Sequence, residues 1–446
     1  MEKTFFFYDL ETSGLDPRMD RIMQFAGQRT DLDLNPVGEP VNLLVRLAED
    51  SLPSPYAIKV TGITPQKTVA EGLSEAEFCK FVMGEVFGPG TVAVGYNSVR
   101  FDDEFMRFCL WRNFFDAYEW QWRDGRSRWD LLDVVRLTRA LRPEGIKWPV
   151  DKEGKGTNRL ELITKLNGIS HEAAHDALSD VEALIDVARL IRKQQPKLFD
   201  YLFEMRDKKK VMELVNLAEP KPFLYASGRY AGEFEKTTVA FPLAPAPNGN
   251  LLVFDLRYNV EDLDAGAESY YPVVKELKYN RCPAVAPLGV MRAEDWGRIG
   301  LSLDVVEKNR KALLGRPDFA EKMRTTVEER PEFPPAEEVE GALYDGFLDN
   351  GDRVRCEAVR NALERDLADF HPEFADPRLP ELLVHYKGRN FPQTLSEGEQ
   401  KIWEGYRMGR IGAAKDGYIK AINELAGRGG DGFVLKELQL WYESLI

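Results

Sequence analysis

Two carboxylates stand near the end of the first apolar run of the chain. Residues 5–10 are typical of a buried strand. Asp9 lies within this run and Glu11 directly after it, two residues further along the chain. Side chains two apart on a strand point to the same face, so both carboxylates are expected to project together. Carboxylates held together away from water need a cation, and Mg²⁺ takes oxygen ligands. The pair indicates a metal site, while the alternative is that both acids follow the strand into solvent.

A third acid follows a second expected strand. Residues 91–96 form a short apolar run, and Asp102 comes after it at the expected start of a helix. Asp102 lies directly behind the apolar Phe101, so we expect it to face a site. Asp103 and Glu104 are interpreted instead as charges that the helix dipole favours at a helix N-terminus.

A histidine and a further acid lie seventy residues beyond. Apolar residues recur at helical spacing from Ala177, and this helix is expected to end before Pro196. Positions five apart on one helix differ by ~140°, so His175 is placed in the preceding loop and Asp180 on the helix. His175 would then act as a general base and Asp180 as a metal ligand. The alternative is a solvated loop histidine.

The elements around these residues alternate between strand and helix over the first ~195 residues, which is typical of an α/β domain. Ser74 and Glu77 form a capping box that predicts a helix start, as do Ser396 and Glu399. Later elements are expected as follows: helix over 197–220, strands at 237–241 and 251–256 separated by prolines and glycine, a linker at 330–335, and helices at 354–367 and 435–445.

Together, the acid pair, the later acid and the His-x4-Asp pattern resemble the DEDDh exonucleases, whose ribonuclease-H-like fold carries these motifs in this order. The segment 159–162 before His175 is also similar to that family's third motif. The resemblance implies two Mg²⁺ ions, replaceable by Mn²⁺, that clamp the phosphodiester while His175 removes a proton from the attacking water. The implied metal ligands are Asp9, Glu11, Asp102 and Asp180, and the implied catalytic set adds His175.

The resemblance goes beyond the superfamily level: several further segments are similar to the bacterial exodeoxyribonuclease I family, and the similarity covers essentially the whole chain. The similar segments are residues 60–66, 127–134, 141–146, 343–347 and 388–395. The resemblance implies an α/β ribonuclease-H-like domain with a mixed sheet flanked by helices (1–195), an SH3-like α+β domain (196–335) and an all-α domain (336–446). It implies a monomer that degrades single-stranded DNA processively from the 3′ end, releases 5′-mononucleotides, and serves DNA repair and recombination.

Residues 100–142 support nucleic-acid binding independently, because they hold nine arginines, no lysine and ten aromatics. Arginine suits phosphate, and aromatic faces stack on any base; core packing is expected to explain about half of these residues. By resemblance, the substrate contacts are Glu11, Arg107, Tyr118, Trp122 and Arg136, with Arg159 near the scissile phosphate. The family also binds the acidic C-terminal tail of the single-stranded-DNA-binding protein, at positions that match Arg142, Tyr201 and Lys221.

Composition narrows the class of protein. The 446 residues, 43% hydrophobic and 30% charged, suit several domains, and no apolar run approaches the ~18–20 residues that span a membrane. The net charge of −14 disfavours nonspecific coating of nucleic acid but permits a local basic groove. Four cysteines without paired spacing suit a reducing cytoplasm and argue against a zinc or disulfide scaffold.

Two other functions are considered. One is a non-catalytic module that binds single strands or their binding protein, which the complete acidic set disfavours. The other is an RNA-trimming DEDDh exoribonuclease, which shares the catalytic motifs but is much shorter than this chain.

Overall fold

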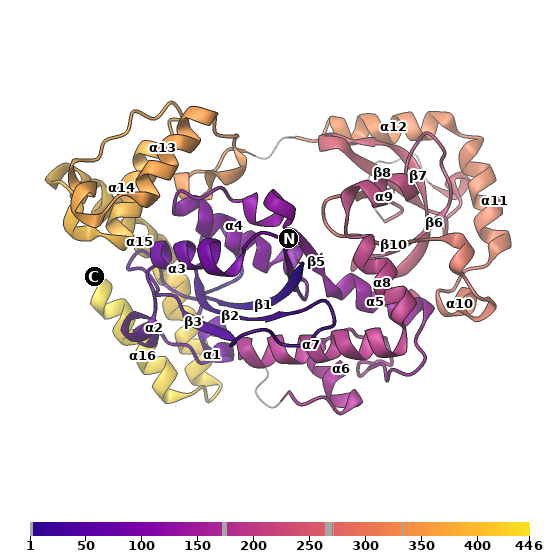
Figure 1. Cartoon of the computed structure of the whole chain (residues 1–446), viewed down its shortest axis with the longest axis horizontal. Helices are drawn as coiled ribbons and strands as arrows, with labels where there is room; N and C mark the ends of the chain where they lie inside the picture. The colour runs from indigo at the N-terminus through magenta and orange to yellow at the C-terminus, as the bar shows by residue number, and fades with distance from the viewer. Residues whose placement is uncertain (1–2, 172–175, 264–269, 271, 332–333) are drawn as a thin grey trace. The chain divides into compact units, whose positions relative to one another are not determined.

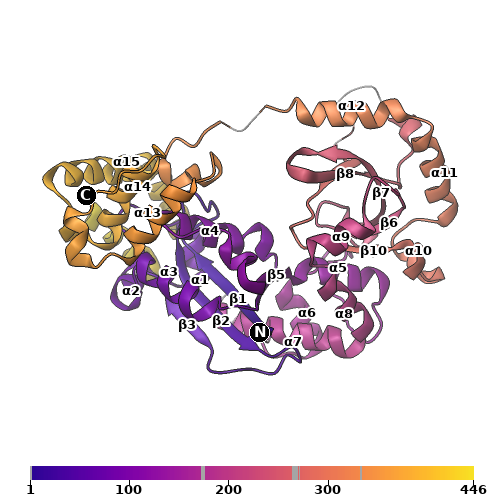
Figure 2. The same cartoon turned by 45° about the horizontal axis from the view of Figure 1, so that its top comes forward.

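The computed structural model describes residues 3–171, 176–263, 270, 272–331 and 334–446. The chain forms two compact units, shown from two directions in Figures 1 and 2. The first unit comprises Met1–Ser127, Glu172–Glu182 and Pro334–Ile446, and the second comprises Arg128–His171 and Ala183–Phe333. His175 and the other three residues of 172–175 lie outside the described residues.

A mixed sheet forms the centre of the first unit. Its strands follow the order β3-β2-β1-β4, with β1 antiparallel to β2 and parallel to β4. The predicted first strand is longer than expected and runs through Glu11, so the alternative that Asp9 and Glu11 follow it into solvent is wrong. The bounds are β1 (Thr4–Thr12), β2 (Ile22–Thr30), β3 (Val41–Leu44) and β4 (Thr91–Gly95).

Helices α3 (Glu75–Phe81) and α4 (Asp102–Arg112) cover one face of this sheet (Figure 1). Phe6 and Tyr8 of β1 pack there against Phe78 of α3 and Phe105 of α4, all fully buried. The predicted capping box is present at the start of α3, where Ser74 and Glu77 bond each other's backbone N–H groups. Two further short helices, α1 (Pro55–Thr61) and α2 (Pro65–Glu71), precede α3.

The C-terminal part of the first unit is helical. Its elements are α13 (Asn350–Asn361), α14 (Leu379–Asn390), α15 (Glu397–Gly427) and α16 (Gly432–Leu445). The capping box predicted at Ser396 opens α15. The helix predicted at 354–367 was placed wrongly: Asp349 caps α13 so that it begins at Asn350, and it stops where Ala362 becomes extended, before a 3₁₀ segment, Glu364–Asp369.

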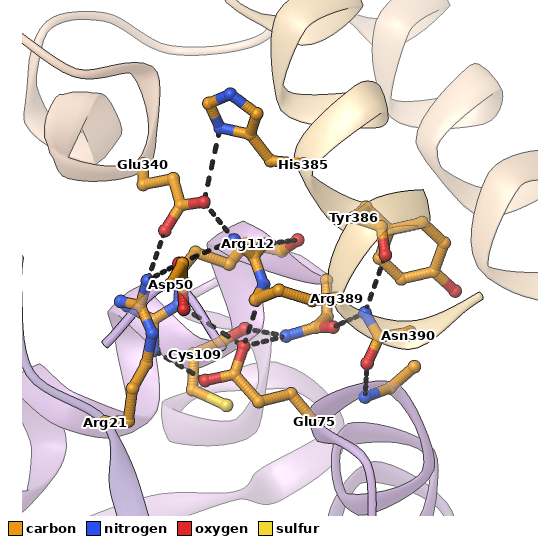
Figure 3. Close-up of polar contacts among 12 residues, drawn as sticks. Arg21, Asp50, Glu75, Cys109, Arg112, Glu340, His385, Tyr386, Arg389 and Asn390 are labelled. Atoms are coloured by element: carbon orange, nitrogen blue, oxygen red, sulfur yellow. Dashed lines mark hydrogen bonds and ion pairs between the residues drawn. The ribbon is translucent and has the colours of Figure 1, made fainter. Parts of the chain in front are cut away.

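A buried charge network joins these helices to the N-terminal part of the first unit (Figure 3). Arg21 Nη2 lies 2.7 Å from both Asp50 Oδ2 and Glu340 Oε2, and Arg389 forms a further ion pair with Glu340. The side chains of these four residues are at most 1% exposed. Burial raises the pKa of Asp50, but the arginines around it outweigh burial and hold the pKa at about 2.

The second unit is built around an antiparallel sheet with strand order β10-β6-β7-β8-β9, against which α12 packs through contacts such as Phe254 with Phe319. The strands are β6 (Phe223–Ala226), β7 (Thr237–Ala246), β8 (Asn250–Asp255), β9 (Val274–Leu277) and β10 (Ala284–Pro287). The remaining elements are α5 (Leu131–Leu141), α6 (Leu160–Asn167), α8 (Pro196–Glu204), α9 (Lys208–Leu214), α10 (Ala293–Arg298), α11 (Leu303–Leu314) and α12 (Pro317–Glu328).

Two elements contribute to both units, and two others depart from the limits expected from the sequence. Strand β5 (Ser127–Asp130) and helix α7 (Ala177–Gln194) each contribute residues to both units. The predicted helix over 197–220 is two helices, and the chain is not helical beyond Val215. Pro242 and Pro245, expected to follow a strand that ends at Phe241, lie inside β7 instead, because β6 pairs with β7 only as far as Ala240 and leaves the following edge free to hold proline. Pro247 follows the strand, as expected.

Candidate active site

The first unit brings three of the predicted acids together. Asp9 and Glu11 point to one face of β1, and Asp180 stands in the first turn of α7. Carboxylate oxygens of these three residues lie within 4.8 Å of one another. Oxygens bound to one Mg²⁺ are separated by about 3–4 Å, since each metal–oxygen bond is about 2.1 Å long. The three carboxylates therefore have the donor type and spacing that suit a divalent cation.

Asp102 borders the same cluster from another element. It is the first residue of α4 and is buried, and its negative charge acts on both Asp9 and Glu11. Among the described residues, the carboxylate oxygens that lie within 4.8 Å of one another belong to Asp9, Glu11 and Asp180, and Asp102 is not part of this group. Four acids from one strand and two helices thus concentrate negative charge in one place.

Burial and this concentration of charge together raise the pKa of Asp9 and that of Glu11. Burial is the main reason that the pKa of Asp9 is well above its ordinary value, and the charges of Asp102, Asp180 and Glu11 add to it. Burial, followed by Asp180, Asp102 and Asp176, raises the pKa of Glu11 to about 8. A divalent cation would remove this repulsion and let the carboxylates ionise, so the residues present fit the implied metal.

Asp176 is a contributor that sequence reasoning missed. Its Oδ1 accepts a hydrogen bond of 3.1 Å from the backbone N–H of Ser179, and its backbone carbonyl accepts one from Asp180. Asp176 therefore caps the first turn of α7, which carries Asp180. An aspartate just before an expected helix is the available sequence signal for this role.

Asp103 and Glu104 do more than complement the helix dipole. Asp103 is buried and accepts a hydrogen bond of 2.5 Å from the Tyr8 hydroxyl of β1. Glu104 forms an ion pair of 2.7 Å with Arg107 and accepts a hydrogen bond from Tyr344. Both acids thus help to fix α4, and with it Asp102, against its surroundings.

The expected DNA contacts of the first unit lie along and after α4. Arg107 donates a hydrogen bond of 2.8 Å to Gln121, and its guanidinium lies 5.4 Å from the centre of the Tyr118 ring. Trp122 is 63% exposed. Six of the ten aromatics between residues 100 and 142 are buried, close to the half expected to form core: Phe105, Phe108, Trp111, Phe114, Trp120 and Trp129.

The other two expected DNA contacts belong to the second unit. Arg136 forms an ion pair of 2.5 Å with Asp133 on α5. Arg159 precedes α6, is exposed, and its Nε lies 2.7 Å from Glu161 Oε1.

The second unit also contains a cavity of about 500 Å³ that holds two of the three expected partner contacts, Arg142 and Tyr201. Arg142 is oriented by hydrogen bonds of 2.6 Å to the carbonyls of Leu141 and Val290. Sequence reasoning missed Lys197 and Arg292, which also line the cavity. Lys221 is not among the lining residues and instead forms an exposed ion pair with Glu219.

The part of the chain that the structure describes contains no helix both long and apolar enough to cross a membrane. Its four cysteines are free and buried, and the Sγ atoms of Cys79 and Cys109 lie 3.6 Å apart.

Three family models match the chain. They are described as Exonuclease (residues 6–188), Exonuclease I SH3-like domain (206–270 and 262–329) and Exonuclease I C-terminal domain (337–445). Exodeoxyribonuclease I of Haemophilus influenzae is 39% identical to this chain, and the match covers 92% of this chain and 90% of the relative. Exodeoxyribonuclease I of Escherichia coli K12 is 40% identical, and the match covers 91% of this chain and 89% of the relative. An oligoribonuclease of Marinobacter nauticus is 27% identical over only 37% of this chain.

Solved structures of exonuclease I match over the full length of both chains, including the following two. One is the zinc-bound form of an E. coli exonuclease I–single-stranded DNA complex, with a TM-score of 0.93 and 37% identity. The other is a complex named as SSB/exonuclease I with an inhibitor, with a TM-score of 0.92 and 36% identity.

Proposed function

The chain belongs to the exodeoxyribonuclease I family, and we propose that it hydrolyses single-stranded DNA from the 3′ end with Mg²⁺ held by its acidic cluster. It is an exodeoxyribonuclease, and the observation that carries the proposed chemistry is the convergence of Asp9, Glu11 and Asp180 beside Asp102. Processive release of 5′-mononucleotides and a role in DNA repair and recombination are part of the same proposal.

Each residue of the site has a proposed role in the reaction. Asp9, Glu11, Asp102 and Asp180 would hold two Mg²⁺ ions, or Mn²⁺ in their place, because carboxylate oxygens are the ligands that these hard cations take. When bound, the ions would activate a water and neutralise charge at the phosphate. His175 would act as the general base that accepts a proton from the attacking water. Glu11 also contacts the terminal nucleotide, and Arg159 holds the phosphate near the scissile bond.

The test uses DNA labelled at one end. Single-stranded and duplex oligonucleotides carrying a 5′ or 3′ label are incubated with and without Mg²⁺, alongside Asp9→Asn and the control Glu39→Gln, which changes an exposed acid outside the site. We expect the 5′-labelled single strand to shorten stepwise and the 3′ label to leave as a mononucleotide. Full activity of Asp9→Asn, or equal degradation of duplex, would contradict the proposal, and a matched RNA strand tests sugar selectivity.

The cavity around Arg142 and Tyr201 supports a second proposal, that it binds the acidic C-terminal tail of the single-stranded-DNA-binding protein. Arg142, Lys197 and Arg292 line a largely apolar interior that includes Leu198 and Val290. Arg142 forms an ion pair of 3.0 Å with Asp295 and Arg292 one of 3.8 Å with Glu144, and an acidic tail would compete with these carboxylates for the two arginines. The family-level complex with SSB supports this assignment.

A fluorescent peptide with the acidic tail sequence tests the docking site. Arg292→Ala and Tyr201→Ala are expected to weaken peptide binding at least tenfold, whereas Lys209→Ala, on the exposed surface of α9, is the matched control. Lys221→Ala should have the smaller effect, because Lys221 does not line the cavity. Equal binding by all the variants would refute the site.

The organisation of the chain completes the proposal. We propose three domains, at 1–195, 196–335 and 336–446, because each contains a matched family model. We also propose a cytoplasmic monomer, since acids from one chain build the metal cluster and the cysteines are free.

The RNA-trimming alternative is disfavoured because the oligoribonuclease similarity covers a minor part of the chain. The binding-module alternative is disfavoured because every acidic position is filled.

A further inference from the structure

The first unit holds a second concave feature, separate from the acidic cluster. It is a cavity of about 290 Å³ between the loop that follows α4 and helix α13. Its walls are aromatic and apolar and include Trp111, Phe115 and Tyr118 on one side and Phe347 and Val354 on the other. This volume is at the lower end of the range for small-molecule sites and suits one flat ring system better than a larger ligand.

The backbone of the loop is held in an unusual conformation that shapes the cavity. Phe114 has a φ of +62°, in the left-handed region that bulky residues rarely adopt. Hydrogen bonds fix it there: the Phe115 N–H donates to the Leu110 carbonyl at 2.9 Å, and Arg360 donates to the Phe114 carbonyl at 3.1 Å. The next residues, Phe115 and Tyr118, are thereby turned into the cavity wall.

Arginines, acids and the exposed ring of Phe347 line the cavity. Arg123, Arg353 and Arg360 line the cavity together with three acids. They form ion pairs with Glu119 at 2.6 Å, Asp116 at 3.9 Å and Glu357 at 3.8 Å, respectively. Ion pairs in contact with solvent contribute little, so these guanidinium groups can exchange a carboxylate for a phosphate at small cost. Phe347 is 87% exposed and Val354 is 67% exposed, so two residues that line the cavity present apolar surface to solvent.

Helix α4 connects this cavity to the acidic cluster. Asp102 is the first residue of α4 and Trp111 is nine residues further, which corresponds to about 13.5 Å along the helix axis. Arg107 lies between them and contacts the Tyr118 ring through its guanidinium. A DNA strand that follows α4 from the acids would reach the cavity after about two to four nucleotides, depending on how far it is extended.

We propose that this cavity accepts one unstacked nucleobase of the single-stranded DNA substrate, on the 5′ side of the nucleotide that is cleaved. The aromatic walls accept any base by stacking, and the arginines that line the cavity bind the flanking phosphates. Such a site would retain the strand while the terminal nucleotide is removed, without selecting a sequence. The proposal rests on the proposed function, since it names where that substrate is held.

The test is a binding scan with abasic nucleotides. The full chain in EDTA is titrated into 5′-labelled oligothymidylates of twelve nucleotides, each with a single abasic nucleotide at one of positions two to eight from the 3′ end. We expect one position, or two adjacent ones, between the second and fifth to weaken binding by about 5- to 150-fold, as for loss of one stacked base, and the others to change it little.

Two matched variants test whether the base at that position binds in the cavity. Val354→Trp fills the cavity from α13 and is expected to remove the position dependence, whereas Ala358→Trp places the same ring on an exposed position of α13 outside the cavity and should preserve it. Phe347→Ala, at an exposed residue, should reduce the same position-specific effect without affecting folding.

The outcomes separate the two proposals. A flat scan in the unaltered protein, or an unchanged scan in Val354→Trp, overturns the base site. Absence of any strand binding or Mg²⁺-dependent cleavage in the unaltered protein would instead overturn the proposed function.

Discussion

Replacing Asp180 by asparagine removes one negative charge from the acidic cluster without changing the size of the side chain. In the metal-free protein, Glu11 keeps a proton up to a pH of about 8, whereas in the unfolded chain it loses the proton near its ordinary pKa of 4.5. The folded state therefore binds more protons between these two values. It follows that this group stabilises the fold at low pH and that the stabilisation is lost as the pH rises towards 8.

The size of the effect follows from the geometry. Two unit charges 4.8 Å apart repel by about 3.5 kcal/mol at an effective dielectric constant of 20, which is an upper value here because the cluster is partly exposed. Burial, and not Asp180, is the largest cause of the raised pKa of Glu11. We therefore assign roughly 1–2 kcal/mol to Asp180, which corresponds to about 2–8 °C in Tm for a unit of this size.

The assay is thermal unfolding at pH 8, in EDTA and in Mg²⁺, alongside cleavage of labelled DNA. In EDTA, Asp180→Asn should melt higher than the unaltered protein and depend less on pH between 5 and 8. In Mg²⁺ the order should reverse, since only the intact cluster gains from binding the ion, and cleavage by the variant should be lost. Glu182→Gln, an exposed change on the same helix, is the control. If Asp180→Asn melts lower in EDTA, or responds to Mg²⁺ as strongly as the unaltered protein, the reasoning is refuted.

Four further predictions concern the general base, the buried charge network and strand binding. His175→Ala should slow the chemical step by ~10²–10⁴-fold in single-turnover cleavage while strand affinity is unchanged, and an unaltered rate would exclude it as the general base. Glu340→Gln removes a carboxylate partner from two buried arginines and should lower the free energy of unfolding by about 3–5 kcal/mol in a denaturant titration. In the unaltered protein, Asp50 should stabilise the fold above its ordinary pKa of 3.8, and this stabilisation should be lost as the pH falls towards 2. Trp122→Ala should weaken strand binding by about 5- to 150-fold, measured by fluorescence anisotropy, with no change in Tm because the ring is exposed.

Local sequence patterns predicted the elements that carry the site. The apolar run at 5–10 identifies β1, and the two-residue spacing correctly places Asp9 and Glu11 on one face. The capping boxes at Ser74 and Ser396 identify helix starts, because the residues that form each cap are three apart in the chain.

Features that depend on distant segments were not predictable in this way. The prolines of β7 are tolerated because the neighbouring strand β6 stops pairing with β7 at Ala240. The positions of the prolines in the sequence do not reveal where that pairing stops. Cys79 and Cys109 meet although thirty residues separate them. Arg21 and Glu340 are 319 positions apart, and neither carries a local signal of the other. The role of Asp103 against Tyr8 was missed for the same reason.

The link between Arg21, Asp50 and Glu340 also determines when the protein can finish folding during its synthesis. A ribosome adds about 5–20 residues per second, so roughly 15–60 s pass between the addition of Asp50 and that of Glu340. Throughout that interval the nascent N-terminal sheet has a cationic side chain whose second carboxylate partner does not yet exist. Nascent chains arrested before residue 340 should therefore be cut by protease near Arg21, and those extended past Arg389 should resist it.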